Sequence, residues 1–137
     1  MEEKKMVSLD LVLGLKDDEI TALPKGEYPT KRLGLVPLRA ITPEELKEVR
    51  KDSAVRNKAG QITDIDEDLM AALMWTKALD TSRTDFDFGN PELLKKLGVT
   101  TKVQVVRKLL LVGEIQMGCL YIKDLSGFSA TATDLKN

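Results

Sequence analysis

A chain of 137 residues, 42% apolar and 31% charged, is long enough for one domain with one hydrophobic core and typical of a globular protein. Its net charge of −1 predicts no general attraction to nucleic acids or to anionic membranes. Histidine is absent and Cys119 is the single cysteine, which excludes zinc-finger sites, nucleophile–histidine pairs and an internal disulfide. We therefore expect a protein that is not an enzyme and that needs no cofactor, metal or small-molecule substrate.

The first 29 residues are expected to form an arm and a linker. Leu9, Leu11 and Leu13 alternate with other residues, which predicts a weak strand or a loose arm, and two prolines around Gly26 then mark a linker. No apolar run is long enough to cross a bilayer, and Asp10 interrupts the apolar stretch that a signal peptide would need. We therefore expect a cytoplasmic chain that does not bind a membrane.

A strand and a helix are predicted after the linker. Residues 31–41 have the composition of a strand, and Pro37, which cannot donate to a ladder, places it at a sheet edge. Glu45 follows a threonine and a proline in the pattern of a capping box, which predicts a helix over residues 43–52. Residues 53–64 are expected to form a polar loop with a turn.

Three further helices are predicted, over residues 66–80, 91–97 and 102–124. The first is apolar around most of its circumference, so it is either central to the core or shared with a partner. Gly98 ends the second. The apolar side chains of the first of these helices are Leu69, Met70, Leu73, Met74, Trp75, Ala78 and Leu79.

These elements predict a fold class and a domain organisation. The fold is expected to be mainly α, a small helical domain with a short N-terminal β element that is a strand or a hairpin. Residues 30–128 form this single helical domain, with the edge strand at its N-terminal end. Residues 1–29 precede it as the arm and linker, and the polar residues 129–137 follow it as a flexible tail.

The last predicted helix carries two apolar stripes at helical spacing. The stripe that includes Val106, Met117 and Leu120 is the simplest core face. From Leu111 onward the opposite face is also apolar, so it needs a cover from the arm, from another element of the chain or from another protein. A break near Gly113 would instead merge the two stripes. The candidate partner-binding residues are Leu111, Ile115, Gly118 and Ile122 of this helix and Met74 and Trp75 of the helix at 66–80.

Two stretches have competing interpretations. Residues 93–110 have the layout of a helix-turn-helix with Lys102 and Arg107 on its second helix. An ordinary helical hairpin is the alternative, and the near-neutral charge argues against DNA binding. Residues 64–68 (DIDED) suggest a calcium loop, but the turn glycine is missing, which favours capping of a helix.

Several short motifs occur in an order and spacing that resemble one protein family. They are residues 35–45 (LVPLRAITPEE), the helix at 66–79, the Leu93-Leu94 helix, residues 110–115 (LLVGEI), Ile122 and residues 125–128 (LSGF). Together they resemble the XkdN-like tail assembly chaperones of long-tailed phages and prophages of Gram-positive bacteria. The resemblance runs from Arg32 to Gly127, and residues 1–29 match no part of the family pattern.

The resemblance implies a specific role. Such a protein binds and solubilises the tape measure protein before the tail tube polymerises around it, with the tail tube protein as a second partner. It self-associates, needs no cofactor, acts in the host cytoplasm and is absent from the mature virion. A frameshifted, longer product of the same gene is also expected. The alternatives are a helix-turn-helix DNA-binding regulator and a structural or adaptor component of a phage particle.

Overall fold

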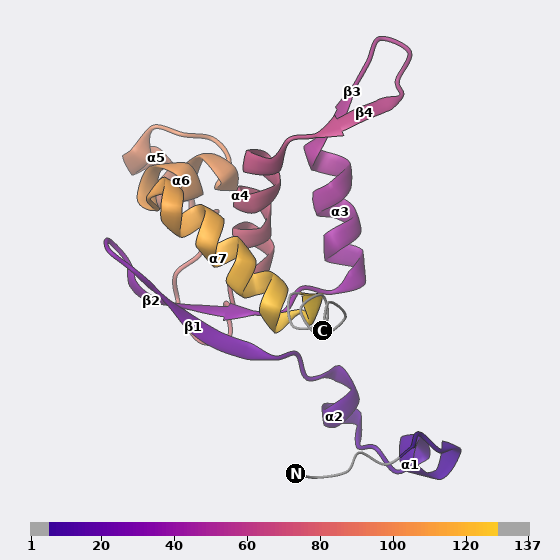
Figure 1. Ribbon diagram of the computed structural model, residues 1–137. Coiled ribbons are helices and arrows are strands. Elements are labelled where there is room, and N and C mark those ends of the chain that lie inside the picture. The colour runs from indigo at the N-terminus through magenta and orange to yellow at the C-terminus, as the bar shows by residue number, and fades with distance from the viewer. Residues whose placement is uncertain (1–5, 129–137) are drawn as a thin grey trace.

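The computed structural model describes residues 6–128, and the expected flexible tail at residues 129–137 lies outside this range. The helices and strands follow one another along the chain as seen in Figure 1. They are α1 (Leu9–Leu13), α2 (Asp17–Thr21), β1 (Lys25–Thr30), β2 (Gly34–Arg39), α3 (Pro43–Ser53), β3 (Ala54–Arg56), β4 (Ile62–Ile65), α4 (Glu67–Ala78), α5 (Pro91–Leu97), α6 (Lys102–Leu109) and α7 (Val112–Leu125).

The expected fold class, mainly α with β structure only near the N-terminus, is wrong. Within residues 6–128, helices account for 51% of the residues and strands for 16%, and two antiparallel two-stranded sheets are interspersed with the helices. The unexpected sheet is the β3–β4 hairpin, which occupies the predicted polar loop. Its turn forms because the Asn57 side chain accepts the backbone N–H groups of Ala59 and Gln61, while Gly60 adopts a positive φ of 83°.

The helix α4 is the centre of the fold. It packs against α3, α6 and α7, and β2 also reaches it. Trp75, Met74 and Ala72 are fully buried on α4, which explains why its apolar residues surround the helix instead of forming one stripe. The predicted helices at 43–52, 66–80 and 91–97 are confirmed.

Helix α3 starts as the sequence predicts. The Thr42 hydroxyl accepts the Glu45 N–H at 3.2 Å, and the Glu45 carboxylate accepts the Thr42 N–H at 2.9 Å. Arg39 donates two hydrogen bonds to the same carboxylate, at 2.8 and 2.9 Å. Burial alone would raise the pKa of Glu45, but the hydrogen bonds from Arg39 and Thr42 outweigh it and leave this pKa below its ordinary value.

The β1–β2 hairpin lies against the helical body. The Tyr28 ring packs edge-on against Trp75, with ring centroids 5.7 Å apart, and against Tyr121 at 5.6 Å. A Cβ on Gly26 would overlap the Tyr121 hydroxyl, so the strand can approach α7 this closely only with glycine there. Residues 25–30 are thus a strand, although the sequence suggested a linker.

An ion pair between Asp80 and Arg83 ties this hairpin to the loop after α4. Asp80, which is 7% exposed, accepts hydrogen bonds from Ser82 and from Arg83 Nε at 3.0 Å. Arg83 also donates to the carbonyl oxygens of Gly26 at 2.7 Å and Leu38 at 3.2 Å, one on each strand. The Ser82 hydrogen bond is the largest of the effects that hold the Asp80 pKa below its ordinary value.

The predicted helix over residues 102–124 is two helices, α6 and α7, because the chain breaks at Leu110 and Leu111. Both residues have extended backbone angles. The break is stabilised from a distance: Arg32 donates to the carbonyl oxygens of Lys108 and Leu109 at the end of α6. The Glu114 carboxylate accepts the Leu111 N–H at 2.8 Å.

This break turns α7 relative to α6 and merges the two predicted stripes into one core. Ile115 and Ile122 are buried, whereas Met117 and Leu120 are 57% and 51% exposed. The expectation that Met117 and Leu120 belong to the core face is therefore wrong. The exposed side of α7 is the one that the sequence pattern assigned to the interior.

The arm formed by residues 6–23 projects away from the helical body (Figure 1). It contains α1 and α2 instead of the weak strand considered from the leucine alternation. Ser8 explains the first helix, because its hydroxyl accepts the Leu11 N–H at 3.1 Å as an N-cap. Neither helix contains a buried residue, and neither makes an extended contact with another helix or strand.

Candidate functional site

Five of the six candidate partner-binding residues lie in the interior of this chain. Trp75, Met74 and Ile122 are fully buried, and Ile115 is 8% exposed. Trp75 Nε1 donates to the Ile115 carbonyl oxygen at 3.0 Å. Gly118 lies directly under the indole, where a Cβ would overlap Trp75. The cover expected over this stripe thus comes from α4 of the same chain.

Leu111 is the exception. It occupies the N-cap position of α7, without a capping hydrogen bond from its side chain, and is 40% exposed. Contact of Leu111 with a partner stays a prediction, as does contact of the five interior residues, which a partner could reach only if the core opened.

A hollow lies between α3 and α7. α3 and α7 both pack against α4 but make no comparable contact with each other, so α4 forms the floor between them. The cavity measures about 340 Å³. Its lining residues are Leu46, Arg50, Met70, Met74, Leu120, Lys123 and Phe128.

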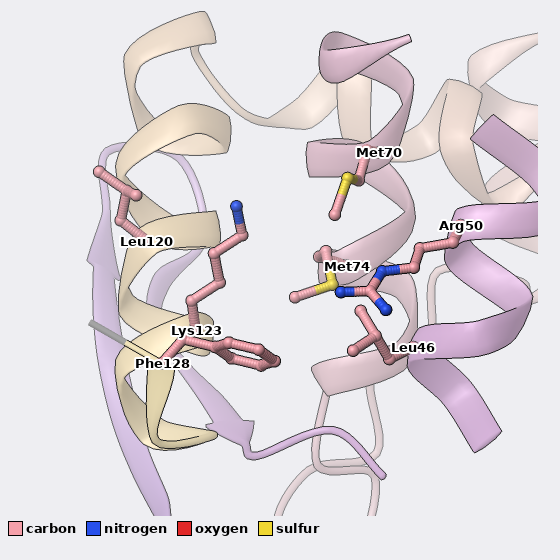
Figure 2. A pocket seen from close by; sticks show the side chains of 7 residues that line it. All are labelled: Leu46, Arg50, Met70, Met74, Leu120, Lys123 and Phe128. Carbon is pink, nitrogen blue, oxygen red and sulfur yellow. The ribbon is translucent and has the colours of Figure 1, made fainter. Parts of the chain in front are cut away.

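The side chains in this hollow divide into an apolar floor and a basic rim. In Figure 2, Met70 and Met74 point from α4 into the space, and the Phe128 ring faces them from the end of α7. Arg50 extends from α3 and Lys123 from α7 on opposite sides of it. Methionine side chains are flexible and polarisable, so such a floor can adapt to partners of different shape.

A second hollow continues the first toward the β3–β4 hairpin. It measures about 560 Å³ and shares Arg50, Met70 and Lys123 with the first. We call the two together the α3–α7 groove. The further residues of the groove are Lys47, Lys51, Arg56, Ile62, Ile65 and Glu67.

The rim of the α3–α7 groove is strongly basic. It contains five cations, three of them on α3, against the single carboxylate of Glu67. Within residues 6–128, no carboxylate forms an ion pair with Lys47, Arg50, Lys51 or Lys123. These cations are therefore available to a negatively charged partner. The chain as a whole is nearly neutral, so the groove is a local concentration of positive charge.

The sequence pattern pointed to only one residue of this groove, Met74. Leu120 was assigned to the core because residues 102–124 were predicted to form one unbroken helix. The repeated cations at 47, 50 and 51 are a signal that could have been found, because they share one side of α3. Phe128 lies beyond the last helix, and no local pattern indicates its position.

Other kinds of site find little support. Within the described range, no group of three or more possible metal ligands is present and no helix is long and apolar enough to cross a membrane. Burial raises the pKa of the Cys119 thiol, which makes it a poor nucleophile. The helix-turn-helix layout does occur, since Gly98 ends α5 in the left-handed region and α6 starts four residues later. Val105 and Val106 of α6 are fully buried, as in a helical hairpin.

The family comparison agrees with a protein-binding surface. The family model of the phage XkdN-like tail assembly chaperone proteins matches residues 11–137, which include every residue that lines the groove. No curated protein and no solved structure gives a match. The match spans nearly the whole chain, so the chain belongs to the XkdN-like family of phage tail assembly chaperones.

Proposed function

We propose that this chain binds and solubilises the tape measure protein during tail morphogenesis, and that the α3–α7 groove is where the client binds. The observation that carries the proposal is the combination of a methionine-rich apolar floor with an unpaired basic rim. A chaperone works by mass action: it lowers the free concentration of an aggregation-prone segment by covering its apolar surface.

The chemistry of the groove specifies the segment that it takes. An apolar helix face would lie on Met70, Leu120 and Phe128, with the buried Met74 beneath them, as amphipathic helices lie in hydrophobic grooves. Carboxylates flanking that face would pair with Arg50 and Lys123. The expected client segments are therefore amphipathic helices with acidic flanks.

The cellular context follows from the same proposal. The chain would act in the cytoplasm of the host bacterium, before the tube is complete, and would leave before the virion is finished. The tail tube protein is a second candidate partner. A structural component would instead remain in purified particles, and a DNA-binding regulator would show salt-dependent retention on DNA.

Two substitutions on the exposed side of α7 test the groove. Leu120 lines it and is 51% exposed, whereas Met117 is 57% exposed and lies outside it. Co-expression of the tape measure protein with Leu120→Asp should leave most of the client insoluble, with affinity weakened by about tenfold or more. The Met117→Asp variant should protect the client like the wild type.

A charge reversal tests the basic rim in the same assay. Arg50→Glu should weaken client binding, while Lys108→Glu, an exposed cation on α6 outside the groove, should not. Equal effects of the groove variants and their controls would contradict the groove as the binding site. A client that stays insoluble even with the wild-type chain would contradict the function itself.

A further inference from the structure

The arm of residues 6–23 presents an apolar surface that nothing in its own chain covers. Leu9 and Leu13 are each 72% exposed, and Ile20 is 61% exposed. Leu9 and Leu13 are four residues apart, so they lie on one face of α1. A contiguous apolar segment in water is the usual mark of an unfilled contact.

The same arm is acidic. It has four carboxylates and a single cation, and all five side chains are exposed. They are Asp10, Asp17, Asp18, Glu19 and Lys16. Within residues 6–128 none of them forms an ion pair. The arm thus combines apolar side chains with carboxylates, whereas the α3–α7 groove combines an apolar floor with unpaired cations. The two surfaces of one chain are complementary in both respects.

From this complementarity we infer that the arm of one copy of this chain docks in the α3–α7 groove of a second copy. The apolar residues of α1 would lie on the methionine floor, and the carboxylates of α2 would pair with Lys47, Lys51 and Lys123 on the rim. The occupant is a second copy because the arm extends away from the groove of its own chain (Figure 1). The base of the arm is fixed by a hydrogen bond, in which Pro24 O accepts the Ala40 N–H at 2.8 Å.

The base of the arm also lies beside the loop after α4. Thr21 and Leu23 border a hollow with Arg39, Asp80 and Ser82, on a different part of the surface from the groove. From this base α1 and α2 extend away from α3 and α7 (Figure 1). An arm directed outward reaches the groove of a neighbouring copy without reversing its path.

Exchange of arms rests on the same groove as the proposed function, but it requires no client. Its test uses the full chain alone, so a negative result leaves client binding untouched. Light scattering after size-exclusion chromatography, over a range of concentrations, should show a dimer or larger assembly for the wild type. The Leu13→Asp variant should be monomeric at the same concentrations, with a self-association Kd raised by about tenfold or more.

The matched control is Val112→Asp. Val112 is 76% exposed, close to the 72% of Leu13, and lies in neither the arm nor the groove. An aspartate there is also favoured by the first turn of α7. This variant should associate like the wild type. Circular dichroism should show that both variants keep the wild-type helix content, because neither side chain packs in the core.

Zero-length carbodiimide crosslinking decides whose groove the arm fills. In a mixture of ¹⁴N- and ¹⁵N-labelled chains, crosslinks from Asp17 or Asp18 to Lys47, Lys51 or Lys123 should join chains of different label. Crosslinks confined to a single label would show the arm on its own groove and overturn the inference. A wild-type chain that is monomeric throughout, or a Leu13→Asp chain that associates as well as the wild type, would also overturn it.

Discussion

The two β-hairpins of this protein have the same topology but different surroundings. The β1–β2 hairpin packs on Trp75 and Tyr121 through Tyr28 and is tied to the loop after α4 by Arg83. The β3–β4 hairpin extends beyond the ends of α3 and α4 (Figure 1), and Val55 and Ile62 on it are 44% and 57% exposed. The first hairpin therefore contributes to stability, whereas the second contributes surface to the groove. Hairpins of this size gain independent stability only from what they pack against.

The largest expected effect comes from removing the floor under the first hairpin. Trp75→Ala deletes a fully buried indole, its hydrogen bond to Ile115 and its contact with Tyr28. The free energy of unfolding should fall by about 3–5 kcal/mol, as measured by denaturant titration. Met117→Ala, on the exposed side of α7, should change it by less than about 0.5 kcal/mol. Similar losses for the two variants would refute the described core.

The next effect separates the two hairpins directly. Arg83→Ala leaves the buried Asp80 carboxylate without its cation and frees two strand carbonyls, so unfolding should become easier by about 1–3 kcal/mol. Arg56→Ala removes one hydrogen bond to Gly60 O within the second hairpin and should cost less than about 0.5 kcal/mol. Hydrogen exchange should show faster opening of residues 25–30 in the first variant only. Equal costs for the two arginines would remove the distinction between the hairpins.

A dependence on pH should belong to the first hairpin. Because hydrogen bonds, above all that from Ser82, hold the Asp80 pKa in the folded chain below its ordinary value of 3.8, the folded state favours the carboxylate. The resulting stability is complete well above pH 4 and is lost as pH falls through the folded pKa. Asp80→Asn should flatten the acid limb of the stability curve. If wild type and variant lose stability in parallel below pH 4, Asp80 is not responsible.

The smallest effect on stability should coincide with an effect on binding. Ile62→Ser changes an exposed groove residue of β4, so the free energy of unfolding should move by less than about 0.5 kcal/mol while client affinity falls. Val55→Ser alters an exposed residue of the same hairpin that lies outside the groove. It should change neither quantity, as measured by denaturant titration and client pull-down. A matching loss of client affinity in both variants would assign the effect to the hairpin as a whole.

Local patterns predicted the parts of this fold that depend on local chemistry. The capping box of α3, the acidic N-cap of α4, and the N1 proline and Gly98 of α5 placed these helices because each signal acts within one turn of helix. The break at Leu111 was not predictable in the same way. Leu111 offers no capping side chain, and the carbonyl oxygens at the end of α6 are satisfied by Arg32, more than 70 positions away.

The same limit applied to the candidate site. Helical periodicity alone placed two apolar stripes on residues 106–122, but which side chains face the core depends on the break between α6 and α7, which periodicity does not show. The groove is formed by three helices, the β3–β4 hairpin and Phe128 beyond α7, so its basic rim and apolar floor come together only in the tertiary structure. The β3–β4 hairpin was missed because its strands are only three and four residues long and mostly exposed, too short to show a clear alternation.

The contacts at the α6–α7 break have a consequence for how the chain folds. Lys31 N–H donates to Glu114 at 2.7 Å, and Arg32 donates to the carbonyl oxygens at the end of α6. The tip of the first hairpin is therefore hydrogen-bonded to both helices at the break. Synthesis proceeds from the N-terminus, so the hairpin is finished long before Glu114 exists. Pairings between such distant residues slow folding. The α3–α7 groove, which needs α7 as one wall, is therefore assembled only after α7 has been made.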